Sequence, residues 1–506
     1  MFKIIKEILS SLSVIRIRIF FIFILSLIVS FLDVINIGLI IPIINKFVGG
    51  DDLLNFQFFN FINKLSVVEL VSTFVFIIFM KFIFNSFNLF FVTKTGFIIR
   101  EYWTNSLLKK ILKNEYHIKD NQGKMLNDLT IEPLNAARSV MQSLNLISTI
   151  VITFFVFTSL LIIETKLSIA ITLIFLFYFF VIRFFTDKYS QSFGEKRISL
   201  NREFISLNSE IIKNLREIKL YNYINHFFNE ERIVLSKYTK IHTYFILITK
   251  LPGMSNEILV IFSLGLIFLI NNYFGEANLS LLSKVAFLGY GGLKINNYLN
   301  KIIEHRMKIL SNFPSFKSVI NKLETKGFKS GNKIYKGYIK NISFKNVSFS
   351  YSDKKVIERV NLSIKRGQKV FIYGDSGVGK STFLDLLSKN LKPTSGKITI
   401  NNLNLLDLNI KKFRESISYI PQEPFFFRSS IKNNIFLDKT YDEKYFKELL
   451  KKTNCDEFIN KLKNKENYVI QDEGSNLSGG QLKRIAIVRA LIRKPEILLL
   501  DEVTNG

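Results

Sequence analysis

Long, uninterrupted apolar runs fill the first three-fifths of this 506-residue chain. All but one approach or exceed the ~20 residues that a helix needs to cross a hydrocarbon core about 30 Å thick. Buried helices of a large soluble protein are the alternative, but apolar runs of that kind usually stop near about 14 residues. The sequence therefore predicts six membrane-spanning helices. They are residues 17–44, 66–96, 136–163, 167–182, 244–270 and 279–299.

The positive charge of the chain, formally +28, is unevenly distributed between these runs. Lysine and arginine crowd the second and fourth connections, whereas the alternate connections carry few. By the positive-inside rule, the N-terminus, both basic connections and the C-terminal part lie in the cytosol. The charge thus reflects topology and attraction to anionic membrane lipids, and we expect no nucleic-acid partner. We expect a multi-pass protein of the plasma membrane.

Residues 1–15 have apolar and basic side chains at helical spacing, which predicts an amphipathic helix on the membrane face. A cleaved signal peptide is the alternative, but it would end at a small-residue site that the sequence does not show. The single cysteine, Cys455, excludes an internal disulfide.

The run Gly374–Ser381, Gly-Asp-Ser-Gly-Val-Gly-Lys-Ser, has the composition of a phosphate-binding loop. Its glycines let backbone N–H groups point inward, Lys380 reaches the β- and γ-phosphates, and the Ser381 hydroxyl holds Mg²⁺. We predict a buried strand at Lys369–Tyr373 and a helix at Ser381–Leu387, the context that such a loop requires. A chance glycine-rich turn is the alternative, and this context argues against it.

Three further motifs follow the loop. They are Tyr419–Gln422 (Tyr-Ile-Pro-Gln), Leu477–Gln481 (Leu-Ser-Gly-Gly-Gln) and Ile497–Glu502 (Ile-Leu-Leu-Leu-Asp-Glu). The last predicts a buried strand with two carboxylates at its carboxyl end, where open α/β sheets bind ligands. Asp501 suits Mg²⁺ binding, and Glu502 is placed to polarise the water that attacks a γ-phosphate.

With these motifs in this order, the chain resembles an ABC transporter of the exporter type, a half-transporter with its membrane domain ahead of its ATPase. The resemblance implies a multi-domain fold: an all-α six-helix transmembrane domain followed by an α/β P-loop ATPase domain. We expect the transmembrane domain at 16–320, a linker rich in lysine and glycine at 321–338, and the ABC ATPase domain at 339–506. A soluble ABC ATPase acting on DNA or ribosomes is the alternative that the six apolar runs disfavour.

The resemblance also implies an ATP and Mg²⁺ site shared by two identical subunits. Tyr351 would stack on adenine, and Gln422 would sense Mg²⁺ and take part in catalysis beside Glu502. In the plainer interpretation, Tyr351 is a core aromatic residue and Gln422 is a surface polar residue. The Phe425–Phe427 run after Gln422 is either core or a socket for a helix of the membrane domain. The phosphate-binding set would be Gly374, Asp375, Ser376, Gly377, Val378, Gly379, Lys380, Ser381 and Thr382; the metal set Ser381, Gln422 and Asp501; and the set that clasps the nucleotide of the other subunit Ser478, Gly479, Gly480 and Gln481.

The sequence ends at Gly506, shortly after Glu502. The aspartate-containing loop and the switch histidine that follow this glutamate in the family do not occur in it. We therefore expect an ATPase domain truncated after the Walker B strand, and a catalytically impaired fragment is the alternative to an active transporter.

The membrane part resembles most the branch that flips lipid-linked oligosaccharides. The similarity lies in Ser30–Pro42, in Pro252 with Glu257, and in Arg216–Tyr221. It departs from that branch at Lys294, where the branch tends to have arginine. Peptide or multidrug exporters of the same architecture are the alternative.

Asp33 and Lys81 lie in the middle of the first two runs, a depth at which ionisable side chains pair or face a cavity. In one hypothesis Lys81, with Lys250, Lys284 or Lys294, lines a path for an anionic head group such as a pyrophosphate. In the other, Asp33 and Lys81 form a structural pair.

Overall fold

The computed structural model divides the chain into two compact units, Met1–Gly327 and Phe328–Gly506. It describes residues 4–5, 7–8, 16–48, 65–112, 122–163, 165–254, 261, 265, 280–324, 331–351, 354–375, 377–437, 440–471 and 474–502.

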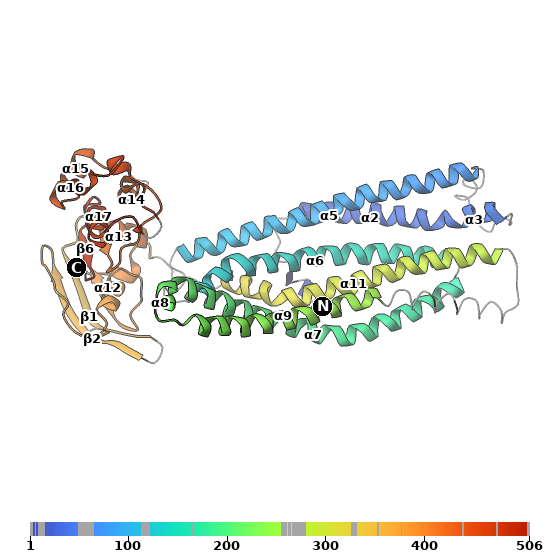
Figure 1. Cartoon of the computed structure of the whole chain (residues 1–506), viewed down its shortest axis with the longest axis horizontal. Coiled ribbons are helices and arrows are strands. Elements are labelled where there is room, and N and C mark those ends of the chain that lie inside the picture. The colour runs from blue at the N-terminus through green and yellow to red at the C-terminus, as the bar shows by residue number, and fades with distance from the viewer. Residues whose placement is uncertain are drawn as a thin grey trace. The chain divides into compact units, whose positions relative to one another are not determined.

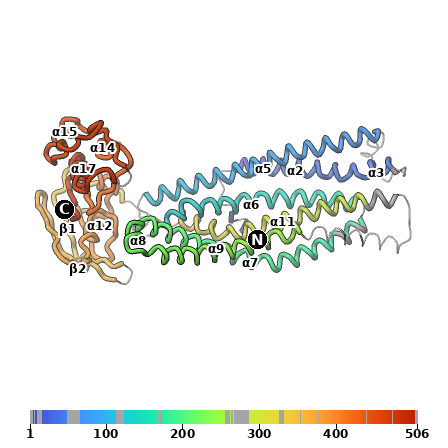
Figure 2. The backbone as a smooth tube through the Cα atoms, viewed as in Figure 1, coloured from blue at the N-terminus to red at the C-terminus, as the bar shows by residue number. Residues whose placement is uncertain are grey.

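The first unit is helical, and its long helices lie side by side (Figure 1). The short helix α8 joins α7 to α9 at one end of this bundle, as the backbone trace shows (Figure 2). The helices are α2 (Arg16–Gly38), α3 (Ile40–Val48), α5 (Val67–Leu112), α6 (Gln122–Ile163), α7 (Thr165–Lys213), α8 (Leu215–Leu220), α9 (Ile224–Met254) and α11 (Ser280–Glu324).

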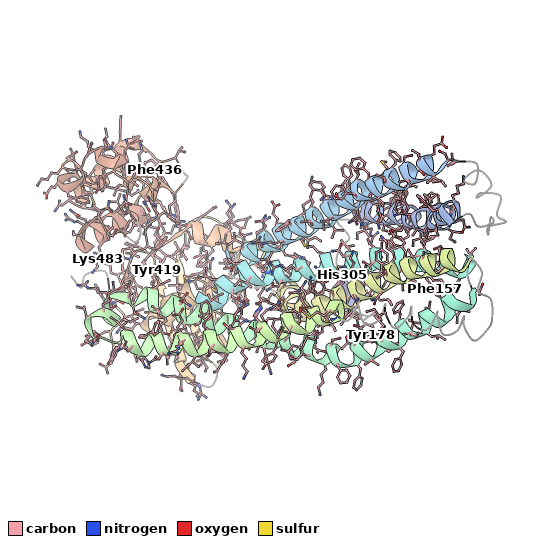
Figure 3. The ribbon with its side chains drawn as sticks, turned by 45° about the vertical axis from the view of Figure 1, so that its right-hand side comes forward. Phe157, Tyr178, His305, Tyr419, Phe436 and Lys483 are labelled. Carbon is pink, nitrogen blue, oxygen red and sulfur yellow. The ribbon has the colours of Figure 1, made fainter. Side chains whose placement is uncertain are left out.

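Two large hydrophobic clusters, and a smaller one around Leu39 and Leu70, lie between the described helices of the bundle. One joins α5, α6 and α11, and in it the rings of Trp103 and Phe316 meet edge to face with centroids 5.8 Å apart. The other lies between α2, α6, α7 and α11, and Phe157 packs against it (Figure 3). Close helix contact needs small residues. A side chain in place of Gly194 on α7 would meet the backbone oxygen of Ser311 on α11 at 2.4 Å.

Polar contacts also connect the long helices, both within the expected spans and beyond them. Arg197 on α7 donates hydrogen bonds to Asn312 (2.8 Å) and Ser315 (3.0 Å) on α11. His305 and Tyr178, which Figure 3 labels, add two more links: the first bonds Gln142 of α6 at 2.7 Å, and the second donates to the Pro252 carbonyl of α9.

Three helical stretches in the described part of the chain are long and apolar enough to cross a membrane: Arg16–Phe47, Val67–Leu112 and Gly123–Ile162. They cover the first three expected spans to within one residue. The fourth span, 167–182, falls within α7 and the sixth, 279–299, on α11, while most of 244–270 lies outside the described residues. The number of membrane-spanning helices, six, stays a prediction, and so does the amphipathic helix at 1–15.

The second unit contains two sheets (Figure 1). An antiparallel sheet has the strand order β2-β1-β3-β4, and α12 packs on it, with the rings of Phe344 and Phe383 stacked 4.5 Å apart. Strands β5 and β6 form a separate parallel pair, with Ile420 beside Leu500. The strands are β1 (Asn341–Tyr351), β2 (Lys354–Lys365), β3 (Ser395–Ile400), β4 (Leu403–Asn404), β5 (Ile417–Ile420) and β6 (Ile497–Leu500).

A second core in this unit lies among its later helices, where Phe426, Phe446 and Ile485 are buried. The helices of the unit are α12 (Lys380–Leu387), α13 (Ile410–Glu415), α14 (Ile431–Phe436), α15 (Glu443–Lys452), α16 (Asp456–Ile459) and α17 (Gly479–Leu491), with short 3₁₀ turns at Leu405–Asp407 and Lys465–Asn467.

One prediction about this unit is wrong. Lys369–Tyr373 forms no strand, and its apolar side chains are exposed, with Phe371 at 91%. The reason is pairing: a strand needs a neighbouring strand for its backbone groups. In the described part of the chain β5 and β6 pair with each other, and none of the strands pairs with this segment.

Candidate functional site

The phosphate-loop sequence forms a tight turn that ends directly in a helix. Gly377 and Gly379 have φ of +85° and +107°, values that side-chain-bearing residues rarely adopt. Helix α12 begins at Lys380, one residue before the predicted start at Ser381. A Cβ on Gly379 would also meet a methyl group of Val356 at 2.6 Å. The loop therefore depends on glycine for both its backbone and its packing.

Lys380 is held by the loop that precedes it. Its ammonium group donates to the carbonyl oxygens of Gly374 at 2.8 Å and Asp375 at 3.2 Å. The first turn of α12, with Ser381 and Thr382, follows directly, so the positive end of the helix and the ammonium group lie together. Such an arrangement attracts a phosphate. Ser376, predicted as part of this set, lies outside the described residues.

Tyr351, the residue predicted to stack on adenine, ends strand β1 beside the loop. Its hydroxyl lies 3.5 Å from the Thr382 hydroxyl, and its ring meets that of Phe349 edge to face at 4.7 Å. The structure therefore places Tyr351 next to the phosphate-loop helix and leaves it half-buried. Stacking on adenine stays a prediction.

The carboxyl ends of β5 and β6 bring Gln422 and Glu502 together. The Gln422 side-chain amide donates to Glu502 Oε2 at 3.0 Å, although the two residues are eighty positions apart in the chain. The parallel register explains the contact, because neighbouring strands end at the same edge. Glu502 has a φ of +49°, an uncommon backbone state that often occurs at functional positions.

Asp501 has a partner that the sequence reasoning did not identify. The Tyr419 hydroxyl donates to Asp501 Oδ2 at 3.1 Å, and the Asp501 backbone N–H donates to the Ile420 carbonyl. Burial, and then the Asp501 carboxylate, raise the pKa of Tyr419, so the hydroxyl stays a proton donor. Tyr419 lies in the Tyr-Ile-Pro-Gln motif that the sequence singled out. Its contact with Asp501, however, depends on the pairing of β5 with β6, which the sequence alone does not indicate.

The Leu-Ser-Gly-Gly-Gln motif forms the start of α17. Ser478 is the N-cap: its hydroxyl accepts from Gln481 N at 3.3 Å, while Gln481 Oε1 accepts from Ser478 N at 2.9 Å. A Cβ on Gly479 or Gly480 would meet nothing within 4 Å, so another molecule has room to approach the backbone there. The helix end offers partial positive charge to an anion.

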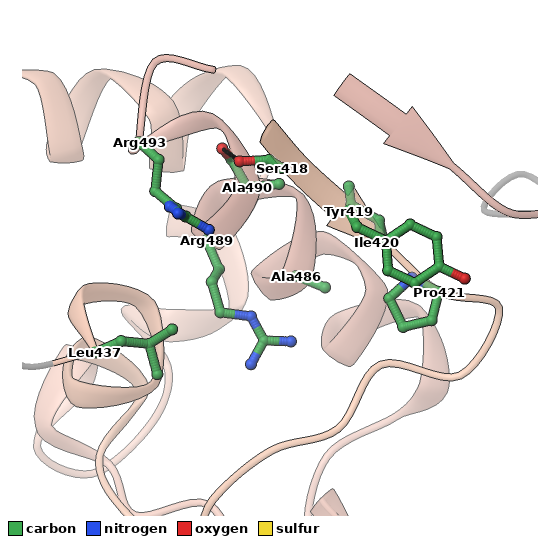
Figure 4. A pocket seen from close by; sticks show the side chains of 9 residues that line it. All are labelled: Ser418, Tyr419, Ile420, Pro421, Leu437, Ala486, Arg489, Ala490 and Arg493. Atoms are coloured by element: carbon green, nitrogen blue, oxygen red, sulfur yellow. Dashed lines mark hydrogen bonds between the residues drawn. The ribbon is translucent and has the colours of Figure 1, made fainter. Parts of the chain in front are cut away.

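A cavity of about 190 Å³ lies beside β5 and α17, between Tyr419 and the guanidinium of Arg489 (Figure 4). Arg489 donates to the Phe425 carbonyl at 2.8 Å and lies over the ring of Phe426. Because the phosphate-loop residues do not line this cavity, we do not assign the nucleotide to it. Phe426 is core, whereas Phe425 and Phe427 are exposed, so a socket made by these two stays a prediction.

Inside the membrane unit, Asp33 is fully buried and pairs with Lys81 of α5, as the structural hypothesis predicts. Lys294 of α11, one of the lysines of the competing hypothesis, lies 3.8 Å from Asp33. The Tyr298 hydroxyl also donates to Asp33, a contact that the sequence did not indicate. Lys250 lies on α9, and the side chain of Lys284 is outside the described residues.

Comparison with known proteins places these features in one family. A family model described as ABC transporter transmembrane region matches residues 19–286, and one described as ABC transporter matches residues 357–505. Similar proteins include ATP-binding cassette sub-family B member 5 of Mus musculus (42% identical over 170 residues), multidrug resistance protein 1 of Entamoeba histolytica (41% over 173) and the mitochondrial ATP-dependent permease MDL2 of Saccharomyces cerevisiae (43% over 170). Each alignment covers 33% of this chain and 14%, 13% and 22% of those relatives, respectively.

The whole fold resembles that of a bacterial Atm1-family ABC exporter solved with ATP bound. The TM-score is 0.81 at 16% identity, over 98% of this chain and 87% of the other. This agrees with the predicted order of a helical transmembrane domain followed by an ATPase domain. The lipid-linked-oligosaccharide branch is not distinguished by these comparisons. Because the transmembrane-region match alone covers more than half of the sequence, the chain belongs to the ABC transporter family.

Proposed function

We propose that this protein is an ATP-driven exporter that works as a homodimer and moves an amphipathic substrate across the cell membrane, with its ATPase domain in the cytosol. The observation that carries the proposal is the 3.0 Å hydrogen bond between Gln422 and Glu502 at the carboxyl edge of β5 and β6. This bond holds Glu502, the candidate base, beside Gln422, the candidate sensor of Mg²⁺. The same domain also contains the glycine-rich phosphate loop.

The residues present fit a nucleoside triphosphate and Mg²⁺. The glycine backbone of Gly377–Gly379 leaves N–H groups free of side-chain obstruction, and Lys380 supplies a compact positive charge. Ser381, Gln422 and Asp501 provide the oxygen ligands that Mg²⁺ prefers. When bound, Mg²⁺ neutralises charge on the β- and γ-phosphates.

Glu502 is our candidate for the general base. An ionised carboxylate accepts a proton from water and so orients the attack on the γ-phosphate. The Gln422 amide fixes one of its oxygens and leaves the other available to a water molecule. Tyr419 has the same effect on Asp501, since it engages one carboxylate oxygen and leaves the other available to a metal ion.

We infer the dimer from the position of the Leu477–Gln481 motif, which we propose as a second contact for phosphate. Ser478, Gly479, Gly480 and Gln481 form the open N-terminus of α17, about a hundred residues after the loop. We propose that this helix end binds the γ-phosphate held by the partner subunit, so that ATP closes two copies around two nucleotides.

For the substrate, we propose a lipid-linked oligosaccharide or a similar amphiphile. Its support is the resemblance of Ser30–Pro42 and Arg216–Tyr221 to that branch. Drug-like compounds or peptides are the second candidate, favoured by the name of the Entamoeba relative, a multidrug resistance protein.

The experiment compares purified protein reconstituted in liposomes with its variants. We expect Lys380→Ala to lose ATP binding, and Glu502→Gln to keep binding but lose hydrolysis by about 10²-fold or more, because only the base is removed. Glu457→Gln, at an exposed position on α16, is the matched control and should hydrolyse ATP normally. Glu502→Gln hydrolysing ATP at the wild-type rate would refute the assignment of the base.

The same liposomes test the substrate. ATP-dependent transfer of a polyprenyl-diphosphate-linked sugar between leaflets supports the flippase, and ATP-dependent uptake of labelled peptides supports the second candidate. If the protein binds no ATP and stays monomeric in its presence, the proposed function is wrong.

A further inference from the structure

We propose that α2 and α6 form a binding site for an anionic phospholipid of the cytosolic leaflet. One acyl chain would lie in a cavity between the two helices, and the phosphate would bind Arg16 and Arg18. This inference goes beyond the proposed function, because it requires neither ATP nor a transported substrate. It comes from an apolar cavity that lies beside two arginines at the cytosolic end of α2.

The cavity has a volume of about 310 Å³ and lies between the start of α2 and the middle of α6. The described residues that line it are apolar apart from Arg16 and Ser148. Ile22 and Leu144 in its wall are buried, whereas Phe20 is 61% exposed, so the cavity is closed toward the bundle and open on its outer side. A volume of about 300 Å³ or more with mostly apolar walls is typical of a site for a small ligand.

The cavity extends from the level of the lipid head groups into the hydrocarbon region. Arg16 directly precedes the expected span 17–44, which begins on the cytosolic side by the positive-inside rule. Phe23, two turns further along α2, also lines the cavity, so its wall extends about 10 Å along the helix. Apolar cavities stay dry and bind apolar ligands. In a bilayer, the available apolar ligand is an acyl chain.

The two arginines supply the charge for a head group. Arg16 is exposed and lines the cavity. Arg18 is half-buried, and its Nη1 atom is buried without a hydrogen-bond partner among the described residues. Arg18 lies one turn before Ile22, so these two residues share the helix face that borders the cavity. A buried donor without an acceptor is costly, and an oxygen atom of a ligand would remove that cost.

Basic residues at the cytosolic end of a span also orient the span, a role that requires no cavity. That role does not explain why Arg18 Nη1 is buried or why Arg16 borders an apolar cavity. Guanidinium groups bind phosphate through two parallel hydrogen bonds, and basic residues near the membrane attract anionic lipids of the cytosolic leaflet. We expect a lipid with a net negative charge, because the ammonium group of a zwitterionic head group would be repelled by the second arginine.

Lipid titration of the purified, nucleotide-free protein tests the ligand class, with bound molecules counted by native mass spectrometry. The probes are phosphatidylglycerol, phosphatidylcholine with the same acyl chains, and glycerol phosphate, which has a phosphate but no chain. We expect phosphatidylglycerol to bind at least about tenfold more tightly than phosphatidylcholine, and glycerol phosphate not to displace it at equal concentration. Equal affinity for the two lipids, or displacement by glycerol phosphate, would overturn the inference.

Variants on α2 test the contact with the phosphate. Arg16→Gln and Arg18→Gln should each weaken phosphatidylglycerol binding about tenfold and leave phosphatidylcholine binding nearly unchanged, because only charge is removed. Arg100→Gln is the matched control, since this arginine of α5 follows the expected span 66–96 but does not line the cavity. Thermal unfolding without added lipid detects a folding defect in any variant. Normal phosphatidylglycerol binding by both α2 variants would contradict the site.

A variant on α6 tests the place of the acyl chain. Ile147 lines the cavity, so Ile147→Trp fills part of it without changing the charge, and it should weaken the binding of both lipids about tenfold. Ile150→Trp, at a 47% exposed position on the same helix, is the matched control and should bind both lipids normally. If Ile147→Trp binds both lipids as the wild type does, the chain does not lie in this cavity and the inference is wrong. If it does so and also turns a dimer into monomers, a second copy of the chain covers the cavity instead.

Discussion

Ser478 has two roles that two substitutions can separate. It caps α17 through the reciprocal pair with Gln481, and in the proposed dimer it contacts the γ-phosphate held by the partner. Ser478→Ala removes the hydroxyl and with it the cap. Ser478→Asp keeps the cap, because aspartate is as good an N-cap as serine, but adds a negative charge where the phosphate would bind.

The magnitudes differ for stability and activity. An N-cap contributes about 1 kcal/mol, which in a unit the size of Phe328–Gly506 lowers Tm by about 2–4 °C when it is lost. A carboxylate roughly 4 Å from a phosphate charge is disfavoured by about 4 kcal/mol at an effective dielectric constant of about 20, close to a thousandfold in affinity. Stability should therefore fall only for Ser478→Ala, and ATP hydrolysis most for Ser478→Asp.

Thermal unfolding without nucleotide and ATPase rates in liposomes measure the two effects, and hydrogen exchange at the Gln481 amide reports the cap locally. Ser475→Asp is the matched control, because it adds the same charge at an exposed position three residues earlier. Wild-type ATPase activity in Ser478→Asp would refute the phosphate contact. An unchanged Tm and unchanged exchange in Ser478→Ala would refute the capping argument.

Three further predictions follow from local contacts. Gly379→Ala should weaken binding of a fluorescent ATP analogue about tenfold or more, since the left-handed backbone costs about 1–2 kcal/mol and the new methyl would clash with Val356; unchanged affinity would contradict this. Burial raises the pKa of Cys455, so little thiolate forms at neutral pH and maleimide should label it only as the protein unfolds; rapid labelling of the folded protein would contradict this. Phe426→Ala should destabilise the protein by about 3–5 kcal/mol in denaturant unfolding and its exposed neighbour Phe425→Ala by less than about 0.5, and equal effects would contradict the burial argument.

Sequence alone predicted the features that depend on neighbours along the chain. The helix expected from Ser381 is α12, which begins at Lys380, and its start depends on glycines within a few positions of it. The cap of α17 is equally local, because a capping box spans only three residues. Strand β6 was also predicted, since four apolar residues followed by Asp501 and Glu502 are a strong local signal. Its predicted burial is only half correct, because Leu498 and Leu500 are exposed.

Contacts between distant segments could be predicted only in part. The depth of Asp33 and Lys81 in their spans indicated a pair, and the structure has it. The same reasoning could not find Tyr298, because its approach to Asp33 depends on how α11 packs against α2. Tyr419 and Asp501 likewise meet only through the register of β5 and β6.

The segment Lys369–Tyr373 shows the limit of a local pattern most clearly. Its composition is that of a buried strand, but it lacks the neighbours that β1 has in β2 and β3 on its two sides. Burial of a strand is a property of the sheet, since backbone groups and side chains both need neighbours to cover them. Without a paired strand among the described residues, Phe371 and its neighbours are exposed although their sequence is apolar. The phosphate loop that follows keeps its predicted turn nonetheless, because its glycines and the first turn of α12 fix that turn locally.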